Sequence, residues 1–578
     1  MKRTGRVIAI VTCMIIVVMF GVIPVVQAQA PEDDVFAVIK ISNPEALLPQ
    51  IAQFVDQFQP GMGGIVNSMM VGNQVFKNPE WKGMDMAGEY TAVVLNPMKY
   101  AQNPVGIIVP LTNKNEYLSA LSETLTGGEE TDGLYTFMQP NQKSLLVGIS
   151  GNAGVLTENA EVAAQVKSLI EANSPALSDV PTVKGQITAS IRLGKILVAM
   201  QPMIDMFKGQ FLAGMDQEVQ GETEGAEGDQ PSNTVKNIAE SEVDTALALL
   251  KQTEQVQFGI GFEPEGVRLA KAVFPMADST LAKFMAAQTP QTSQLMSVIP
   301  ADSAIMMAGS LNFTPEFKEG YVGFLKAILG ASEALDQATS DKLTTWAEGA
   351  FEAFGGDFAA GLLSPTSDSL MTEVVSVKDA AKARELVGQY PEILQMMSGM
   401  YEDMGFELSM KLADTTEVAG GEMMSYDFNF NADMIPDPEG QEVFTQLFGE
   451  KLSLPIGFTD KYVVAGFGKT GQSQVADVVK ALGSGAKAAA KYSPEMFGFP
   501  EKNNMFMVLS VPKILSWAEA NNLPDVPHFD AEEGPGLAMA ARFVDSRLEG
   551  ELYLPIEELL ILKNISDQAQ GMEQPSAE

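Results

Sequence analysis

The sequence contains nearly the same decapeptide twice. GEYTAVVLNP begins at Gly88 and GDFAAGLLSP begins at Gly356, and the two align without a gap. Five more pairs of segments match in the same order, beginning at residues 31 and 300, 105 and 370, 145 and 463, 184 and 502, and 256 and 537. Because similar segments that recur in one order indicate an internal repeat, we predict that this chain builds one fold twice.

Local patterns within each half predict an α+β fold. The segment DVFAVIKI is rich in β-branched and aromatic residues, which is typical of a strand. Asn43 is then a suitable helix N-cap, Pro44 suits the first helical turn, and apolar residues follow at helical spacing. This exit from strand to helix recurs, with the strands beginning near Val35, Ile187, Ala304 and Met505. We therefore expect two halves, each a mostly antiparallel sheet with helices packed on one face.

The predicted organisation has four parts. Residues 1–30 are a signal peptide, 31–295 the first α+β half, 296–564 the second half and 565–578 a disordered tail. The separation of matching residues grows from 268 at Gly88/Gly356 to 318 at Lys195/Lys513. The second half therefore carries about fifty extra residues, which we place in a surface loop around Asp433–Leu454.

One internal segment differs from the rest in composition. Residues 216–232 contain six acidic residues, no basic residue and no aromatic residue. Such a segment buries too little apolar surface to offset the entropy of ordering, so we predict a disordered loop within the first half.

The N-terminus has the pattern of a secretory signal. Lys2, Arg3 and Arg6 precede an apolar run over residues 7–26, and the small residues of Ala28–Ala30 follow it. We predict cleavage after Ala30 and a location in the periplasm, at the cell surface or outside the cell. Retention as an uncleaved anchor is the alternative, because the apolar run is long enough to span a bilayer.

The charge of the chain disfavours anionic partners. Asp and Glu number 74 against 37 Lys and Arg, which gives a net charge of −37. A field of this sign repels nucleic acid and anionic membrane surfaces. No later segment is long and apolar enough to cross a membrane, so we expect no membrane span after signal cleavage and no nucleic-acid partner.

The sequence has few groups for catalysis. It contains one histidine, His528, and its one cysteine, Cys13, lies in the signal, so we expect no metal centre of Cys/His type, no cofactor and no catalytic residue. Carboxylate chemistry stays open, since Glu89 and Asp357 occupy matching positions and so do Asp33 and Asp302. Such a pair can act if a pseudo-twofold axis brings its members together, but acids that cap turns are the commoner case.

Methionine is abundant, with 33 residues. Ile196, Met200, Met203, Phe207 and Phe211 form one stripe at helical spacing. Methionine adapts to irregular apolar shapes, so this stripe is the candidate surface for an apolar ligand or a partner segment. Ordinary filling of a helix–sheet core is the alternative interpretation.

The order of short motifs resembles a group of exported bacterial proteins of unknown function with duplicated α+β domains. The motifs are P-x-D before a strand, LNP, TNKNEYLSAL, Y-x-F, G-I-S-G and V-A-x-x-V-K-x-L. The resemblance implies export and carries no catalytic residue. We predict an exported, non-enzymatic binding or scaffolding protein whose partner and oligomeric state are unknown. A carrier of apolar ligands lined by methionine-rich helices and a carboxylate-dependent hydrolase are the two alternatives.

Overall fold

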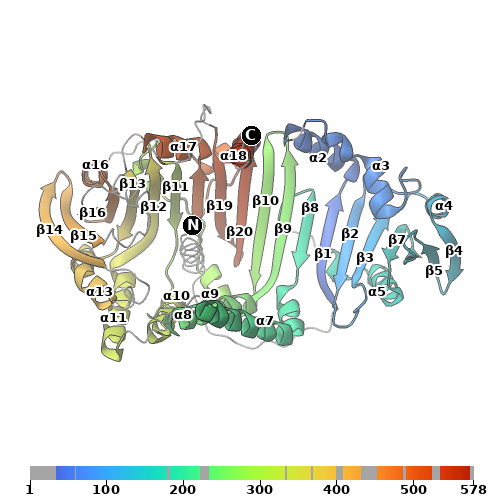
Figure 1. Ribbon diagram of the computed structural model, residues 1–578, viewed down its shortest axis with the longest axis horizontal. Coiled ribbons are helices and arrows are strands. Elements are labelled where there is room, and N and C mark those ends of the chain that lie inside the picture. Colours follow the sequence, from blue (N-terminus) through green and yellow to red (C-terminus); the bar gives the residue numbers. More distant parts are fainter. Residues whose placement is uncertain are drawn as a thin grey trace.

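One antiparallel sheet of twenty strands runs through the described parts of both halves (Figure 1). The computed structural model describes residues 34–58, 60–178, 182–221, 233–331, 335–365, 369–398, 408–430, 452–485, 490–521, 523 and 534–572. The predicted signal peptide and His528 lie outside these residues. Helices and antiparallel strands together confirm the α+β class that the sequence predicts.

The strands of the first half are β1 (Val35–Ser42), β2 (Glu89–Leu95), β3 (Val105–Pro110), β4 (Thr126–Thr131), β5 (Leu134–Met138), β6 (Ser144–Ser150), β7 (Ala153–Thr157), β8 (Ile187–Ile191), β9 (Thr253–Glu263) and β10 (Gly266–Pro275). Those of the second half are β11 (Ile305–Ser310), β12 (Phe354–Ser364), β13 (Ser369–Val377), β14 (Leu408–Val418), β15 (Gly421–Phe430), β16 (Leu452–Phe458), β17 (Tyr462–Gly468), β18 (Met505–Leu509), β19 (Leu537–Val544) and β20 (Arg547–Pro555).

The helices of the first half are α2 (Pro44–Phe58), η1 (Gly63–Ile65), α3 (Ser68–Val71), η2 (Gly72–Phe76), α4 (Lys114–Thr124), α5 (Ala160–Glu171), α6 (Pro175–Ser178), α7 (Leu193–Gly221), α8 (Asn233–Lys251) and α9 (Thr280–Ala286). Those of the second half, with the short helix that leads into it, are η3 (Leu295–Val298), α10 (Pro315–Ala331), α11 (Gln337–Ala353), α12 (Ala380–Gly388), α13 (Tyr390–Met396), α16 (Gly471–Ser484), η5 (Pro494–Phe497), α17 (Val511–Ala520) and α18 (Ile556–Met572).

The order of strands is the same in the two groups of ten. The first group reads β4-β5-β6-β7-β3-β2-β1-β8-β9-β10 across the sheet. The second reads β14-β15-β16-β17-β13-β12-β11-β18-β19-β20. Strands β10 and β20 pair with each other and join the groups into one sheet. Each strand of the first group therefore has a counterpart ten strands later in the chain.

The local signals in the sequence act as expected. Each of β1, β8, β11 and β18 leads into a helix, namely α2, α7, α10 and α17. Asn43 caps α2, since its side-chain oxygen accepts a bond of 3.1 Å from the backbone nitrogen of Ala46. The glycine that opens the second decapeptide permits a close approach of two segments, because a Cβ on Gly356 would lie 1.7 Å from the carbonyl oxygen of Leu311.

The two faces of the sheet differ in how they are covered. Alternate residues on one side, the packed face, are buried: Val38, Ser190, Gln257, Ala272, Ala308, Ala359, Phe506 and Ala540. In the first half, α5 covers this face through Val162 and Val166. In the second half, α16 and the segments that contain η3 and η5 cover it. The largest core cluster of the second half therefore lies on the packed face. In the first half the larger cluster lies on the opposite side, where Tyr117 and Leu121 of α4 pack with Tyr90 of β2 and Val109 of β3.

The opposite side, the open face, has helices near the two ends of its strands (Figure 1). At one end, Phe284 of α9 and Phe317 of α10 cluster with Phe543 and Leu548 of the sheet. At the other end, α2 packs through Phe54, whose ring lies 5.6 Å from that of Phe262, and α18 packs against β20. Helices thus lie on both faces, so the prediction of helices on one face is wrong. A sheet whose residues are apolar on both sides needs cover on both.

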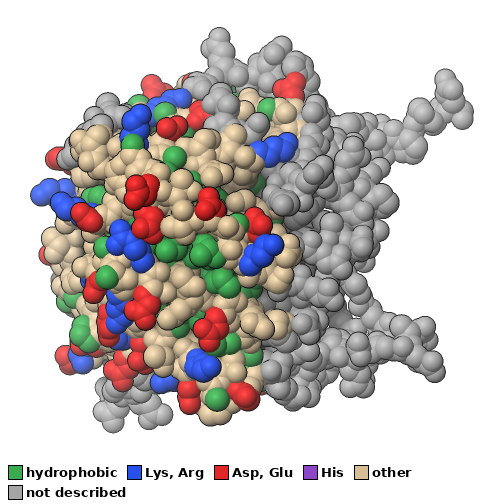
Figure 2. Space-filling view, turned by 90° about the vertical axis from the view of Figure 1, so that its left-hand side faces the viewer, with side chains coloured by type: hydrophobic (Ala, Val, Ile, Leu, Met, Phe, Trp, Pro, Cys, Tyr) green, Lys and Arg blue, Asp and Glu red, His purple; other side chains and the backbone are tan. Residues whose placement is uncertain are grey.

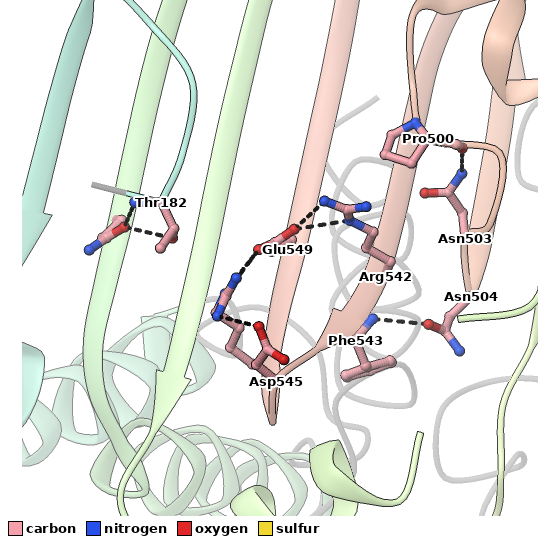
Figure 3. A network of polar contacts seen from close by, with 10 residues as sticks. Thr182, Pro500, Asn503, Asn504, Arg542, Phe543, Asp545 and Glu549 are labelled. Carbon is pink, nitrogen blue, oxygen red and sulfur yellow. Dashed lines mark hydrogen bonds and ion pairs between the residues drawn. The ribbon is translucent and has the colours of Figure 1, made fainter. Parts of the chain in front are cut away.

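The β10–β20 pair is symmetric in register. Ala270 and Glu551, each the fifth residue of its strand, lie opposite each other, and Gly266 lies opposite Pro555. Polar side chains occupy the packed face around this junction (Figure 3). Glu549 accepts bonds of 2.7 Å from both Arg542 and Arg547. The halves are therefore joined by the backbone pairing of β10 with β20, while these ion pairs tie β20 to its own neighbour β19.

Arg268 of β10 crosses that junction. Its guanidinium lies 2.8 Å from Glu263 on β9 and 3.4 Å from Glu551 on β20. It also donates a 3.0 Å bond to the carbonyl oxygen of Phe497 in the second half. The guanidinium carbon lies 5.0 Å from the centroid of the Tyr553 ring, within the range of a cation–π contact.

Two predicted segment boundaries need correction. Helix α7 continues to Gly221, so residues 216–221 of the predicted loop are helical, and 222–232 lie outside the described residues. Helix α18 continues to Met572, so the predicted tail is helical as far as 572. Helices extend into these polar segments because each helix is already nucleated on the packed chain before them, and adding a residue to an existing helix costs little.

The extra length of the second half enters at several places. Part of it is the additional helix α13, part is the greater length of β14 and β15, and part lies in residues 431–451 between β15 and β16. The sequence match of the segments at 145 and 463 is wrong by one strand. It pairs β6 with β17, whereas the counterpart of β17 in strand order is β7. Neighbouring short apolar strands have similar composition, so composition alone did not fix their alignment.

Strand β14 forms one edge of the sheet. Lys411, Asp414 and Glu417 on it are exposed, and charged side chains at an edge oppose pairing with a further strand. Figure 2 looks at the molecule from this end and shows acidic and basic side chains interspersed, with hydrophobic ones between them. The net negative charge of the chain is thus not segregated into a single acidic surface on this side.

Candidate binding site

A continuous line of apolar side chains crosses the open face. Its nine members lie opposite one another on nine neighbouring strands, and together they are named the apolar row: Ile41, Ile187, Ile260, Leu269, Leu552, Met539, Met507, Met307 and Ala360. All except Ala360 are half-buried, whereas most of their neighbours on the packed face are buried, among them Ala270, Ala540, Phe506 and Ala308. The middle of the open face therefore presents apolar surface that the described helices do not fully cover.

Three adjacent members of the apolar row are methionines. Met539, Met507 and Met307 lie side by side on β19, β18 and β11. Side chains directly opposite each other in an antiparallel sheet have Cβ atoms about 5 Å apart, so these thioethers form one patch. Methionine has three rotatable bonds and a polarisable sulfur, which lets such a patch fit apolar groups of varied shape.

The sequence analysis missed this methionine patch. The signal was present in the alternation of IMMAGS, MFMVL and LAMAARFV, where every second residue of a strand lies on the same face. Alternation does not say which face stays open. Only the pairing of the strands brings Met307, Met507 and Met539 together from three distant segments.

The row of open-face side chains next to the apolar row contains a lysine. Phe258 of β9, which is 45% exposed, lies opposite Lys271 of β10. Lys271 is also exposed, and partial desolvation of its ammonium lowers its pKa. The open face thus combines apolar surface with a lysine near the middle of the sheet.

The predicted helical stripe lies on α7, which packs against β9 and β1. Ile196, Met200 and Met203 are half-buried, whereas Phe207 and Phe211 are 58% and 54% exposed. The first part of the stripe is therefore less exposed than the second. The two phenylalanines are exposed apolar groups on a helix that borders the open face.

The predicted carboxylate pairs do not form one site. Glu89 lies on β2 and Asp357 on β12, with eight strands between them. At about 4.8 Å per strand they are roughly 40 Å apart. Asp302 lies 2.5 Å from the hydroxyl of Ser364, and Asp33 lies outside the described residues. The symmetry axis passes between β10 and β20, far from both positions, so it cannot bring Glu89 and Asp357 together.

A separate cavity of about 720 Å³ lies over the packed face of the second half. Two segments enclose it, residues 289–297 and residues 490–503. Its floor includes Ala308 of β11 and Phe506 of β18, which lie opposite each other in the sheet. Its volume is in the usual range for small-molecule sites.

Within the described residues, no group of His, Cys, Asp and Glu side chains could hold a metal ion. No helix of the described chain is both long and apolar enough to span a bilayer. No protein-family model, curated protein or solved structure matches this chain.

Proposed function

We propose that the protein is an exported, non-enzymatic binding protein that holds acyl chains against the open face of its sheet. The observation that carries this proposal is the apolar row, which stays half-buried across eight neighbouring strands. Apolar area that folding leaves in contact with water is available to stabilise a complex, at about 25 cal/mol per Å² covered.

The chemistry of the open face favours an acyl chain over an added peptide strand. Every strand that contributes to the apolar row is hydrogen-bonded to a neighbour on each side, so its backbone offers no free edge for strand addition. The row supplies no hydrogen-bonding side chain. Lys271 adds a positive group suited to the acidic head of a fatty acid or phospholipid.

Two further features support the proposal. The N-terminal pattern of Lys2, Arg3, Arg6 and Ala28–Ala30 supports export. The matching order of strands and the symmetric register of Ala270 with Glu551 support an origin by internal duplication, because a twofold interface places equivalent residues opposite each other. Joining two sheets edge to edge in this way doubles the width of the open face.

The proposal is tested with Met507→Glu, which places a carboxylate in the middle of the apolar row. Palmitate binding is measured by displacement of a fluorescent fatty-acid analogue from the purified mature protein. We expect Met507→Glu to weaken palmitate binding at least tenfold, because an ionised group in an apolar contact is costly to desolvate. Native mass spectrometry of protein purified from its own host would then identify the natural lipid.

Met98→Glu is the matched control, since Met98 is 63% exposed and lies outside the open-face rows. This variant should bind palmitate as the wild type does. Equal binding by the wild type and Met507→Glu, or no palmitate binding by the wild type, would contradict the proposal. Phe211→Glu tests whether the exposed end of α7 belongs to the same surface.

A further inference from the structure

An ion pair on the packed face of the first half has no equivalent at the matching positions of the second half. In the first half, Lys40 of β1 is buried and its ammonium lies 3.1 Å from the carboxylate of Glu89 on β2. The counterpart of Glu89 is Asp357, and the counterpart of Lys40 is Ala308. The second half thus keeps the acid and lacks the lysine that pairs with it.

No salt bridge joins the carboxylate of Asp357 to a basic side chain among the residues that the structure describes. The Oδ1 atom of Asp357 is buried and has no hydrogen-bond partner. Burial raises the pKa of this carboxyl, and a hydrogen bond from the Ser293 hydroxyl lowers it by less. A carboxylate with one buried oxygen left unsatisfied is costly, so a cation brought to this place would be stabilised.

Open space occupies the place of the missing lysine. Ala308, Ser293, Phe506, Tyr492 and Met296 all line the cavity of about 720 Å³. Asp357 lies behind Ser293, on the strand next to Ala308. A lysine side chain at 308 would extend from the floor into this space, as Lys40 extends toward Glu89.

The remaining walls suit an aliphatic cation. Tyr492, Phe506 and Met296 are buried apolar groups, and aromatic faces attract ammonium ions. The Tyr492 ring already has the ammonium groups of Lys491 and Lys513 at 5.5 and 5.6 Å from its centroid, so the aromatic contact of a ligand falls to Phe506. Glu495, Glu501 and Lys502 are exposed lining residues whose charges sum to −1, and the acidic chain as a whole attracts small cations.

We propose that this cavity binds an aliphatic diamine or polyamine, one ammonium of which takes the place of the lysine missing at 308. The methylene chain lies over Phe506 and Met296, and a second ammonium lies near the two exposed glutamates. The site is on the packed face and is independent of the acyl-chain surface on the open face.

Isothermal titration calorimetry at 150 mM salt tests the proposal with three probes of one length: putrescine, n-butylamine and 1,4-butanediol. We expect putrescine to bind more tightly than butylamine, and the uncharged diol to bind at least tenfold more weakly than putrescine. Ala308→Lys places the lysine of the first half in the second half, so it should abolish putrescine binding while the protein stays folded.

Asp357→Asn is the second variant, and it should remove most of the preference for putrescine over butanediol without filling the cavity. Ser409→Lys on the exposed edge strand β14 adds the same charge as Ala308→Lys elsewhere and should leave binding unchanged. Putrescine binding that persists in both Ala308→Lys and Asp357→Asn would show non-specific attraction to an acidic protein and would overturn the proposal. Failure of putrescine to bind the wild type would also overturn it.

Discussion

Replacement of Arg268 by alanine is expected to lower the free energy of unfolding by about 2–4 kcal/mol. Its guanidinium is paired with Glu263 and Glu551, and it donates to the carbonyl oxygen of Phe497. The side chain is only 14% exposed, so the carboxylates lose a partner that water replaces poorly. The contacts that Arg268→Ala removes connect the two halves, because their partners lie on β9, on β20 and in the segment that contains η5.

Urea denaturation followed by circular dichroism measures this effect against a matched surface control. Lys99 is 57% exposed and lies 2.5 Å from Asp34, so Lys99→Ala removes an ion pair from a solvated position. Such pairs contribute less than about 1 kcal/mol. If Arg268→Ala costs no more than Lys99→Ala, the role assigned to Arg268 at the junction is wrong.

Replacement of Glu558 by alanine is expected to cost a similar amount, about 2–4 kcal/mol. Glu558 of α18 is fully buried, and its two carboxylate oxygens each accept a 3.1 Å bond, from the backbone nitrogens of Val511 and Gly536. Val511 is the first residue of α17, whose N-cap Ser510 makes no side-chain capping bond. Glu558 therefore supplies the acceptor that this helix terminus lacks, and alanine would leave two buried N–H groups unpaired.

The pH dependence of the Glu558 effect has a definite sign. Burial raises the pKa of Glu558 above its ordinary value of 4.5, although the bonds from Val511 and Gly536 lower it by less. A raised folded-state pKa contributes stability that is fully present below about pH 4.5 and is lost as the pH rises through the folded-state value. Glutamine does not titrate. The stability of the wild type relative to Glu558→Gln should therefore fall between pH 4 and pH 7.

Denaturant curves of both proteins at the two pH values provide the measurement. All other titrating groups are common to the wild type and Glu558→Gln, so their contributions cancel in the difference. A difference that stays constant, or that grows in favour of the wild type at pH 7, would rule out the raised pKa of Glu558.

Some elements could be predicted from the sequence because their causes are local. Asn43 and Pro44 start α2 through the capping geometry of adjacent residues, and the four exits from strand to helix depend on the same short-range signals. The matching decapeptides at Gly88 and Gly356 lie on β2 and β12, which have the same neighbours in the two groups of strands. Similarity between segments is a property of the sequence, so such matches can be found without a structure.

Other features depend on which segments meet in space. Strand alternation at Met307, Met507 and Met539 assigns each of them to one side of its strand but cannot say that this side of the sheet stays open. The separation of Glu89 from Asp357 depends on the placement of the symmetry axis at β10 and β20. The unpaired oxygen of Asp357 depends on Ala308, which lies on the neighbouring strand β11 two residues from Ser310, the residue opposite Asp357.

The sequence by itself determined the matching segments, the strand-to-helix units and the scarcity of catalytic groups, because these are properties of short segments and of composition. The tertiary structure alone decided which sheet face is packed, where the halves join, and where the position that matches a lysine of the first half borders a cavity in the second. Those outcomes arise from pairing between residues that are far apart in the chain, and the free energy of such pairing is not encoded in any single segment.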